Sequence, residues 1–209
     1  MNVLIACETS GTVREAFRAL GHDVTSCDLL PSDDDSPHHI VGDCRELISG
    51  GGQVRLVRGE FVTDPWDLII MHPPCTAVAV SGNRWYGRNM PKYQQRIDSI
   101  EWTMNLWRLA QKHSKKVCME NPVGVLPLKP TQYIQPWQFG HPESKKTGLW
   151  LWRLPELEPT DLLPTPAKGH WDNQTPSGQN KLGPSPDRWK IRSKTYDGVA
   201  LAMADQWGR

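Results

Sequence analysis

The chain has 209 residues, enough for one domain with a full hydrophobic core. It contains five cysteines, an odd number, and no CxxC pair. This argues against a disulfide framework and against a structural zinc site. Its apolar runs are strand-sized and no signal-like segment opens it, so we expect no membrane span, no signal peptide and a cytoplasmic location. The net charge of +1 divides unevenly, since residues 1–83 hold 5 basic and 12 acidic side chains and the remainder 19 and 11. This division favours either a polyanion partner for the later part, with nucleic acid the obvious candidate, or a surface whose charges simply segregate.

The first residues predict a strand, a turn and a helix. Asn2 to Ala6 form an apolar strand, residues 7–11 (CETSG) a polar turn, and Thr12 to Leu20 carry apolar residues at helical spacing before Gly21. In nucleotide-binding α/β domains such a turn approaches the ligand closely. The turn has one glycine rather than GxGxxG, so a unit without a ligand is the alternative.

An acid follows the second predicted strand. His22 to Cys27 have the strand pattern, and Asp28 stands directly after them, about twenty residues beyond the first turn. That spacing is expected of a carboxylate that binds a ribose hydroxyl pair, while capping of the next turn is the alternative. Ile40 and Val41 predict a short strand that leads to Asp43, and Gly50 to Gly52 predict a flexible connection.

The central stretch is Trp66 to Thr76, with the sequence WDLIIMHPPCT. Its apolar run from Leu68 to Met71 predicts a buried strand, which the following two prolines must end because they donate no ladder hydrogen bond. Cys75 is then held on a stiff loop at the carboxyl end of a strand, where a nucleophile would lie. A buried, inert cysteine beside a turn is the alternative.

The later elements follow the same logic. Residues 77–90 form a polar segment typical of a lid or substrate loop, and residues 154–189 predict an irregular module rich in Pro, Gly, Asn, Gln and Ser. A helix is expected at Tyr93 to His113, and its apolar side is predicted to carry Ile97, Ile100, Met104, Trp107 and Leu109. A second helix is expected at Asp197 to Trp207. Strands are expected at Lys115 to Met119 and at Gly148 to Trp152.

Presumed strands therefore end repeatedly in polar groups. These groups are Cys7 and Glu8, Asp28, Asp43, Cys75, and Glu120 with Asn121. Because parallel strands end at one edge, the pattern predicts an α/β protein of Rossmann-like architecture with a site along that edge.

The order of these motifs resembles the DNA cytosine-5 methyltransferases, particularly the small versions in bacteriophage genomes. The motifs are CETSG, Asp28, GDCR around Asp43, PPC at residues 73–75, and EN at residues 120–121. A PC dipeptide followed some forty-five residues later by a strand that ends in EN is the specific part. The resemblance divides the chain into residues 1–152 as catalytic and cofactor-binding domain, 153–192 as a small irregular recognition region and 193–209 as a helix that packs back on the first domain.

The resemblance implies an S-adenosylmethionine-dependent enzyme that methylates carbon 5 of a cytosine flipped out of DNA. Cys75 matches the thiolate that adds to carbon 6, and Glu120 matches the residue that protonates or hydrogen-bonds ring nitrogen 3. A free thiol is only a few per cent ionised at neutral pH, so its surroundings are expected to help. A raised pKa is expected for Glu120 at the end of an apolar strand.

Further roles follow from the same resemblance. The methionine end of the cofactor would lie against Glu8, Thr9, Ser10 and Gly11, its ribose against Asp28, and its adenine near Asp43. Pro73 and Thr195 would also contact the cofactor. The substrate would meet Pro74, Arg84, Asn121, Lys145 and Lys146.

Four departures separate the chain from the family pattern. Thr76 stands where the family usually has Gln, and the first motif has fewer glycines. The expected arginine pair is missing, with Lys145 and Lys146 the nearest candidates, and a lysine offers a point charge instead of a fork. The reduced recognition region predicts a short or relaxed target that is held mainly through phosphate contacts and stacking.

Other functions remain open. HPPC at residues 72–75 also resembles the (D/N/S)PP(aromatic) motif of amino methyltransferases, which act on exocyclic nitrogens without a nucleophile. A free nucleotide or modified base as substrate is a third possibility, and a catalytically silent nucleic-acid-binding protein on the same fold is a fourth. No obligate protein partner is evident.

Overall fold

The computed structural model describes residues 1–50, 54–57, 60–63 and 65–209. The strands are β1 (Asn2–Ala6), β2 (Asp23–Asp28), β3 (His39–Val41), β4 (Val54–Val57), β5 (Glu60–Thr63), β6 (Trp66–Met71), β7 (Ser114–Pro122), β8 (Gln132–Ile134) and β9 (Thr147–Trp152). The helices are α1 (Thr12–Ala19), α2 (Cys44–Gly50), α3 (Asn83–Tyr86), α4 (Tyr93–His113), α5 (Arg188–Ser193) and α6 (Asp197–Trp207), with short 3-10 turns η1 (Val80–Gly82) and η2 (Pro136–Gln138).

Seven strands form the main sheet, in the order β3-β2-β1-β6-β7-β9-β8. β3, β2, β1, β6 and β7 are parallel, and β9 is antiparallel to both β7 and β8. The order reverses between β1 and β6, since the chain adds strands outward from β1 on one side and from β6 on the other. In open α/β sheets ligands bind in the crevice beyond the carboxyl ends of the strands at such a point. The mostly parallel mixed sheet agrees with a Rossmann-like α/β architecture.

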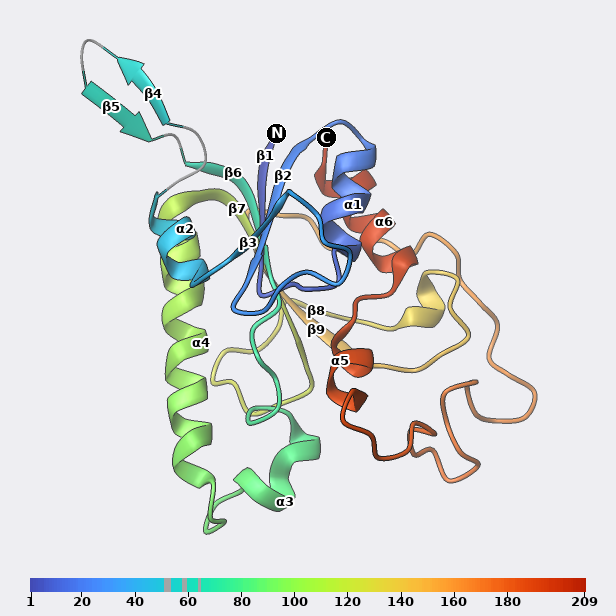
Figure 1. Cartoon of the computed structure of the whole chain (residues 1–209). Coiled ribbons are helices and arrows are strands. Elements are labelled where there is room, and N and C mark those ends of the chain that lie inside the picture. Colours follow the sequence, from blue (N-terminus) through green and yellow to red (C-terminus); the bar gives the residue numbers. More distant parts are fainter. Residues whose placement is uncertain (51–53, 58–59, 64) are drawn as a thin grey trace.

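Helices cover both faces of this sheet, as Figure 1 shows. On one face α1 and α6 pack through Val13, Phe17, Met203 and Trp207 against sheet residues such as Ile5. The opposite face lies under α2 and α4. Ile48, Leu106 and Trp107 pack there against sheet residues that include Leu4, Ile69 and Met119.

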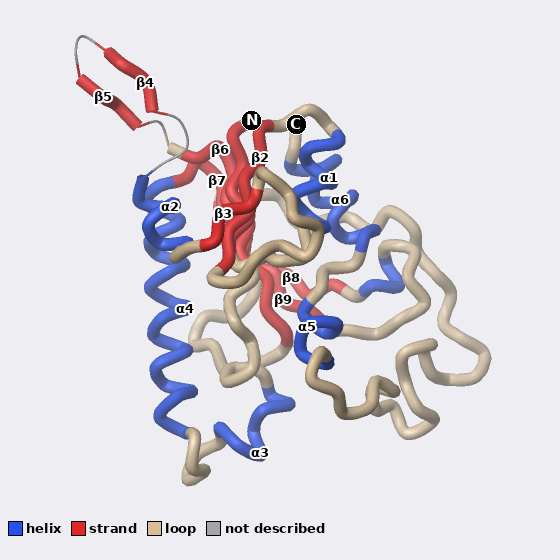
Figure 2. The backbone as a smooth tube through the Cα atoms, in the orientation of Figure 1, coloured by secondary structure: helices blue, strands red, loops and turns tan. Residues whose placement is uncertain are grey.

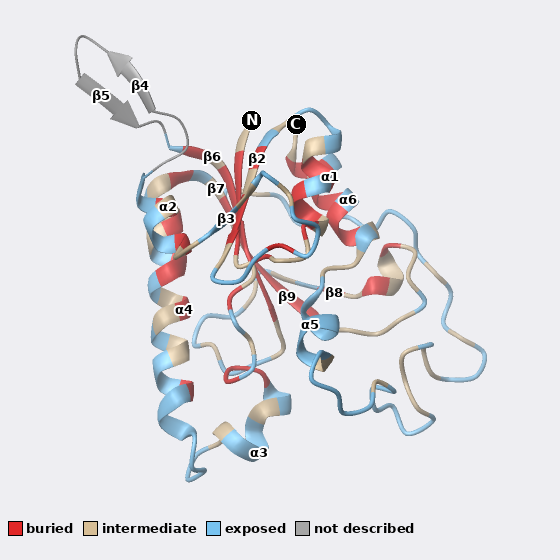
Figure 3. Ribbon diagram, in the orientation of Figure 1, coloured by how far each residue is buried: buried red, intermediate tan, exposed pale blue. Residues whose placement is uncertain are grey.

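Burial on both faces explains the continuous apolar runs of the central strands. Val3, Leu4 and Ile5 of β1 and Ile69 and Ile70 of β6 are fully buried. Each such side chain contributes about 1.5–3 kcal/mol when it leaves water. Figure 3 shows this buried core running through the sheet and the inward sides of the helices. These strands form the rigid support from which the loops at their carboxyl ends extend.

The helix α4 begins and ends at the predicted residues, but its buried side differs from the prediction. The buried residues are Arg96, Thr103, Leu106, Trp107 and Ala110. Ile97 is exposed, and Ile100, Met104 and Leu109 are only partly buried. A buried arginine takes the place that hydrophobic spacing alone assigned to an isoleucine.

Residues 153–187 contain no helix or strand and extend as a long loop beside α5, as Figure 2 shows. The irregular conformation predicted for residues 154–189 is thus present up to residue 187, whereas Arg188 and Trp189 begin α5. β8 and the hairpin of β4 and β5 were not predicted. Of the predicted flexible connection, Gly51 and Gly52 lie outside the described residues. Within the described part of the chain, the search for a helix long and apolar enough to cross a membrane finds none.

Candidate functional site

Polar groups from four segments meet at the carboxyl edge of the sheet. β1, β6 and β7 are parallel neighbours, so Cys7, the loop of residues 72–75 and Glu120 lie at the same edge. β9 runs the other way and begins at this edge, where Thr147 pairs with Pro122. The predicted convergence of strand ends is therefore present for these segments.

The loop that carries Cys75 is held from both sides. The carbonyl of Cys75 accepts hydrogen bonds from the backbone N–H groups of Val78 (3.1 Å) and Ala79 (2.8 Å), which makes a tight turn around the thiol. The side-chain amide of Asn121 donates to the carbonyl of Pro73 at 2.9 Å. Asn121 is 1% exposed, so it positions this loop instead of facing a substrate as predicted.

Arg96 holds the other side of the same loop. Its guanidinium is buried and donates through Nε to the carbonyl of Ala77 (2.7 Å) and through Nη2 to that of Ala79 (3.3 Å). A third hydrogen bond, from Nη1 to the side-chain oxygen of Asn83 (2.8 Å), joins the start of α3 to α4. One arginine thus fixes both the turn after Cys75 and the polar segment that follows it.

Glu120 is buried and paired with a histidine. Its Oε2 atom lies 3.0 Å from Nδ1 of His72, and both side chains are about nine-tenths buried. Burial raises the pKa of the Glu120 carboxyl, but the hydrogen bond to His72 and the charge of Lys145 outweigh it and hold the pKa below its usual value. The predicted raised pKa is therefore wrong, because sequence reasoning weighed burial without these partners.

A pocket opens beside Glu120, with an empty volume of about 280 Å³. Its walls are formed by Glu120, Ile134, Pro136, Lys145, Thr147, Thr195, Tyr196 and Val199. Three predicted site residues, Glu120, Lys145 and Thr195, therefore share one pocket, although they are up to 75 positions apart in the sequence. Cys75 is not among the residues of the described chain that form these walls.

The thiol of Cys75 is partly buried and lies within electrostatic reach of the same carboxylate. Burial and the negative charge of Glu120 raise its pKa, while Lys145 and Arg192 act in the opposite direction. The expectation that the surroundings favour the thiolate is therefore wrong for the ligand-free protein. The thiol thus interacts electrostatically with Glu120, and the positive charges that act on it are Lys145 before β9 and Arg192 on α5.

The adjacent lysines point to different places. Nζ of Lys145 donates to the carbonyl of Lys194 at 3.2 Å and lies 5.8 Å from the ring centre of Tyr196, at the pocket. Nζ of Lys146 instead lies over the ring of Tyr133, 4.4 Å from its centre. Of the two predicted substrate contacts, only Lys145 is placed beside Glu120.

The turn after β1 is occupied largely by contacts within the chain. The carboxylate of Glu8 is 5% exposed and accepts hydrogen bonds from the backbone N–H groups of Val13 (2.8 Å) and Arg14 (3.3 Å), so it caps α1. Gly11 has a φ of 68°, and a Cβ there would meet the guanidinium of Arg14 at 2.3 Å. Ser10 accepts the N–H of Thr12 and donates to Glu8. The carbonyl of Thr9 accepts the N–H of Asp33.

Asp28 differs from these residues, because one of its carboxylate oxygens is free to accept further hydrogen bonds. Its Oδ1 atom accepts the backbone N–H of Leu30 at 3.0 Å, and across the described chain its Oδ2 atom has no hydrogen-bond partner. Leu29 beside it is 74% exposed, although a leucine normally avoids water. Asp43, in contrast, is paired with the guanidinium of Arg45 and is held in its charged form, with a lowered pKa caused mainly by that hydrogen bond.

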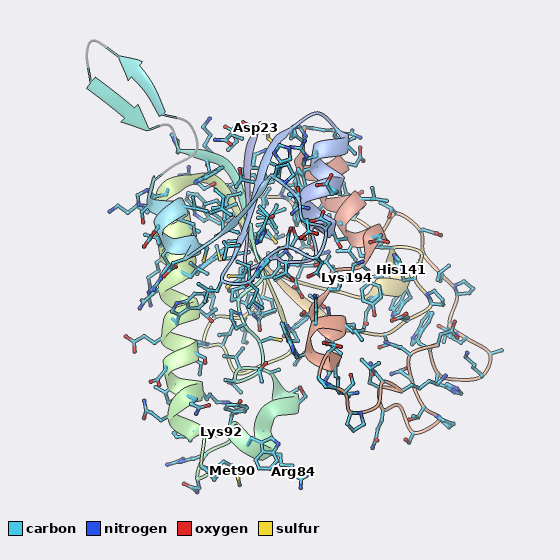
Figure 4. The ribbon with its side chains drawn as sticks, in the orientation of Figure 1. Asp23, Arg84, Met90, Lys92, His141 and Lys194 are labelled. Carbon is cyan, nitrogen blue, oxygen red and sulfur yellow. The ribbon has the colours of Figure 1, made fainter. Side chains whose placement is uncertain are left out.

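The remaining predicted residues lie apart. Pro73 is buried against Asn121 and Pro74 is exposed next to Cys75. Arg84 lies on α3 over the ring of Trp85, 5.5 Å from its centre. Figure 4 shows it with Met90 and Lys92 at one end of the molecule, well separated from Lys194, whose carbonyl binds the pocket residue Lys145. Arg84 is thus not brought to the pocket.

Two site residues have roles that the sequence analysis missed. His72 was considered only as the first residue of HPPC, although a histidine directly before the proline pair that ends a strand is a signal of its own. Tyr196 forms a wall of the pocket and donates its hydroxyl hydrogen bond to Glu143. Among the described residues, the search for three or more His, Cys, Asp or Glu side chains that could hold a metal ion finds no such group.

Comparisons with known proteins give no family for the chain. A scan against protein-family models finds no match, and a search of curated proteins finds no similar sequence.

Proposed function

We propose that the protein is an S-adenosylmethionine-dependent DNA methyltransferase that acts on carbon 5 of cytosine, with Cys75 as nucleophile and Glu120 as the group that faces ring nitrogen 3. The observation that carries the proposal is the placement of this thiol and this carboxylate on adjacent parallel strand ends, β6 and β7, within electrostatic reach of each other. The pocket wall of Glu120, Lys145 and Thr195 supports it further.

The residues at the carboxyl end of β2 fit an adenosyl group. Asp28 has one carboxylate oxygen free for a ribose hydroxyl pair, and the exposed Leu29 offers an apolar surface for a purine. Glu8 and Gly11 fit a different role, because the carboxylate caps α1 and the space at the glycine is filled by Arg14. When bound, S-adenosylmethionine supplies an electrophilic methyl group.

The remaining chemistry belongs to the side chains of this chain. Carbon 5 of cytosine is a poor nucleophile until a sulfur adds to carbon 6, a bond that Cys75 would form. The electron pair displaced from the ring double bond is stabilised if ring nitrogen 3 gains a proton, and Glu120 is the carboxyl group that would hold it. Lys145, beside Glu120, would meet an oxygen of the base or a phosphate.

A nucleic acid fits the charges near the pocket. Arg192 acts electrostatically on Cys75, and α5 also carries Arg188, which is partly exposed, and Lys190, which is exposed and forms an ion pair with Asp33. Exposed arginines and lysines position a phosphate backbone without reading sequence. The target base must leave its stack to reach a buried carboxyl such as Glu120, so base flipping is part of the proposal.

The test is capture of a covalent complex with DNA that contains 5-fluorocytosine. Wild-type protein with S-adenosylmethionine should give a stable protein–DNA adduct by mass spectrometry, and Cys75→Ala should give none. Cys118→Ala is the matched control, because that cysteine is buried on the α1 and α6 side of β7. Methyl transfer that persists in Cys75→Ala would contradict the covalent route, and a wild type that methylates neither DNA nor RNA would favour a binding protein.

A further inference from the structure

Among the described residues, His72 is the titratable side chain that forms a direct hydrogen bond with Glu120 and that the proposed function leaves unused. Its Nδ1 atom lies 3.0 Å from Oε2 of Glu120, and the His72 side chain is 10% exposed. Its second ring nitrogen, Nε2, is buried and has no hydrogen-bond partner among the described residues. A buried polar atom without a partner has a free-energy cost, so the histidine stays there at a penalty that leucine or phenylalanine would avoid.

The backbone makes this contact a fixed one. His72 directly follows β6, and its N–H donates to the carbonyl of Ala6 on β1 at 2.9 Å. Glu120 is near the end of β7, the next strand in the sheet. Both side chains therefore extend from the rigid edge of a central sheet, which holds the imidazole and the carboxylate in register.

The His72–Glu120 pair could supply a proton to ring nitrogen 3 of the base. Ring nitrogen 3 needs a proton as the sulfur adds, but the pKa of Glu120 is held below its usual value, so the carboxyl by itself is ionised at neutral pH. An imidazole in contact with the carboxylate can hold a proton one hydrogen bond further back.

We propose that His72 is a positioning residue that stores the proton for Glu120. The inference rests on the proposed function. The proton moves from Nδ1 of His72 to the Glu120 carboxyl and from there to the ring nitrogen, which leaves a neutral imidazole. After methylation the hydrogen of carbon 5 leaves as a proton to solvent water, its electron pair re-forms the ring double bond, and the carbon–sulfur bond to Cys75 breaks. The ring nitrogen then returns its proton through Glu120 to His72. Each turnover thus releases one proton, the one that the methyl group replaces on carbon 5.

Other charged and titratable groups face this pair. They are Cys75 on the loop after β6, Cys118 on β7, Lys145 before β9, Tyr196 before α6 and, through Cys75, Arg192 on α5. Lys145 favours the ionised carboxylate, whereas a thiolate at Cys75 would disfavour it. The thiol proton is thus the competing source for ring nitrogen 3, and the experiment must separate the two.

The decisive variant is His72→Asn. The asparagine amide takes the place of the Nδ1–H group and can still donate to Glu120, but it cannot give up a proton at any working pH. The matched control is His170→Asn, because His170 bonds only the carbonyl of Lys168 in the irregular region. The measured quantity is the single-turnover rate of methyl transfer from pH 5 to pH 8.5, together with the dissociation constant of S-adenosylmethionine.

In His72→Asn we expect the rate at pH 7.5 to fall by about 100-fold, as for loss of a general acid. The deficit should shrink toward pH 5, because a growing fraction of Glu120 takes its proton directly from solvent as the pH falls, while the cofactor dissociation constant stays unchanged. His170→Asn should follow the wild type. An equal loss at every pH would indicate a structural role only, and a wild-type profile in His72→Asn would assign the proton to Cys75; either result overturns the inference.

A second measurement separates this inference from the proposed function. In protein labelled with ¹⁵N-histidine, one pair of ring signals should disappear in His72→Asn, and the pH at which that pair shifts should change in Glu120→Gln. If the pH at which these signals shift is the same in Glu120→Gln as in the wild type, the shared proton is refuted even in an active enzyme. If they respond but the wild type methylates no nucleic acid, the proton store stands and the proposed function fails.

Discussion

The Nε atom of Arg96 lies 2.7 Å from the carbonyl oxygen of Ala77, two residues beyond Cys75. This contact links the first turn of α4 to the turn that presents the thiol. A side chain that sequence periodicity would place in solvent is thus the anchor of the candidate nucleophile.

Arg96→Met should therefore destabilise the protein and misplace Cys75. The change leaves the buried carbonyls of Ala77 and Ala79 without their donor, at a cost of about 2–4 kcal/mol in the free energy of unfolding. Urea unfolding measures it. Arg108→Met is the control, since Arg108 is exposed and its hydrogen bond goes to the side chain of Asn105 in the same helix. Equal stability of the two variants would contradict the anchoring role.

Gly124→Ala should push apart the loop after Cys75, which contains Val78, and the loop after β7, which contains Gly124. A Cβ at Gly124 would meet the carbonyl oxygen of Val78 at 2.4 Å, where the N–H of Val125 also donates to that oxygen. The backbone must move, so we expect a loss of roughly 1–3 kcal/mol. Gly183→Ala meets nothing within 4 Å and should unfold at the wild-type urea concentration. Crystal structures of both variants would show whether residues 78 and 124 have moved apart.

Stability at acid pH should depend on Glu120. The pKa of this carboxyl is lowered in the folded protein, so its charged form stabilises the fold above the usual glutamate pKa. That contribution is lost as the pH falls below about 4.5 and through the lower folded value. In Glu120→Gln, the free energy of unfolding should thus fall less between pH 7 and pH 3.5 than in the wild type. Glu101→Gln, an exposed change on α4, should keep the wild-type slope.

The irregular region should depend on one aromatic pair. Trp137 on η2 and Trp171 stack with ring centres 5.6 Å apart and planes 2° from parallel. Trp171→Ala removes a contact of about 1 kcal/mol and should expose Lys168 and Lys181 to trypsin. Trp189→Ala is the control, because that ring is 55% exposed. Unchanged cleavage rates in Trp171→Ala would show that other contacts hold the region.

Cys7 and Cys44 should form a disulfide bond under mild oxidation. Their sulfurs lie 3.8 Å apart, and the hydrogen bond from Cys7 lowers the pKa of Cys44, so Cys44 ionises first. Hydrogen peroxide would accept the two electrons. Digestion without reductant should yield a linked peptide pair, which Cys44→Ala removes. A link from Cys7 to Cys27 instead would refute this pairing.

The sequence alone was sufficient to predict the positions of the strands that are buried on both faces. The apolar run of β6 and its stop at Pro73 followed from hydrophobicity and proline chemistry alone, and so did the position of Cys75 at the carboxyl edge. The edge strands were harder. β8 has three residues with one buried side chain, and the antiparallel direction of β9 depends on pairing across the sheet.

The electrostatics of the site required coordinates. Burial of Glu120 was foreseen, but the direction of its pKa shift depends on His72 and Lys145, which are 48 and 25 residues away. The adjacent lysines 145 and 146 look equivalent in the sequence, yet alternation along the extended chain sends them to Tyr196 and Tyr133. Arg84 was assigned by its nearness to Cys75 in sequence, and α3 carries it away.

The pocket has a wall that is synthesised late. Thr195, Tyr196 and Val199 follow every strand of the sheet in the chain, and α6 must dock on α1 before they stand opposite Glu120. A nascent chain on the ribosome can therefore complete its sheet and the turn at Cys75 while the pocket is still open on one side. The cavity beside Glu120 is therefore complete only after translation has delivered α6.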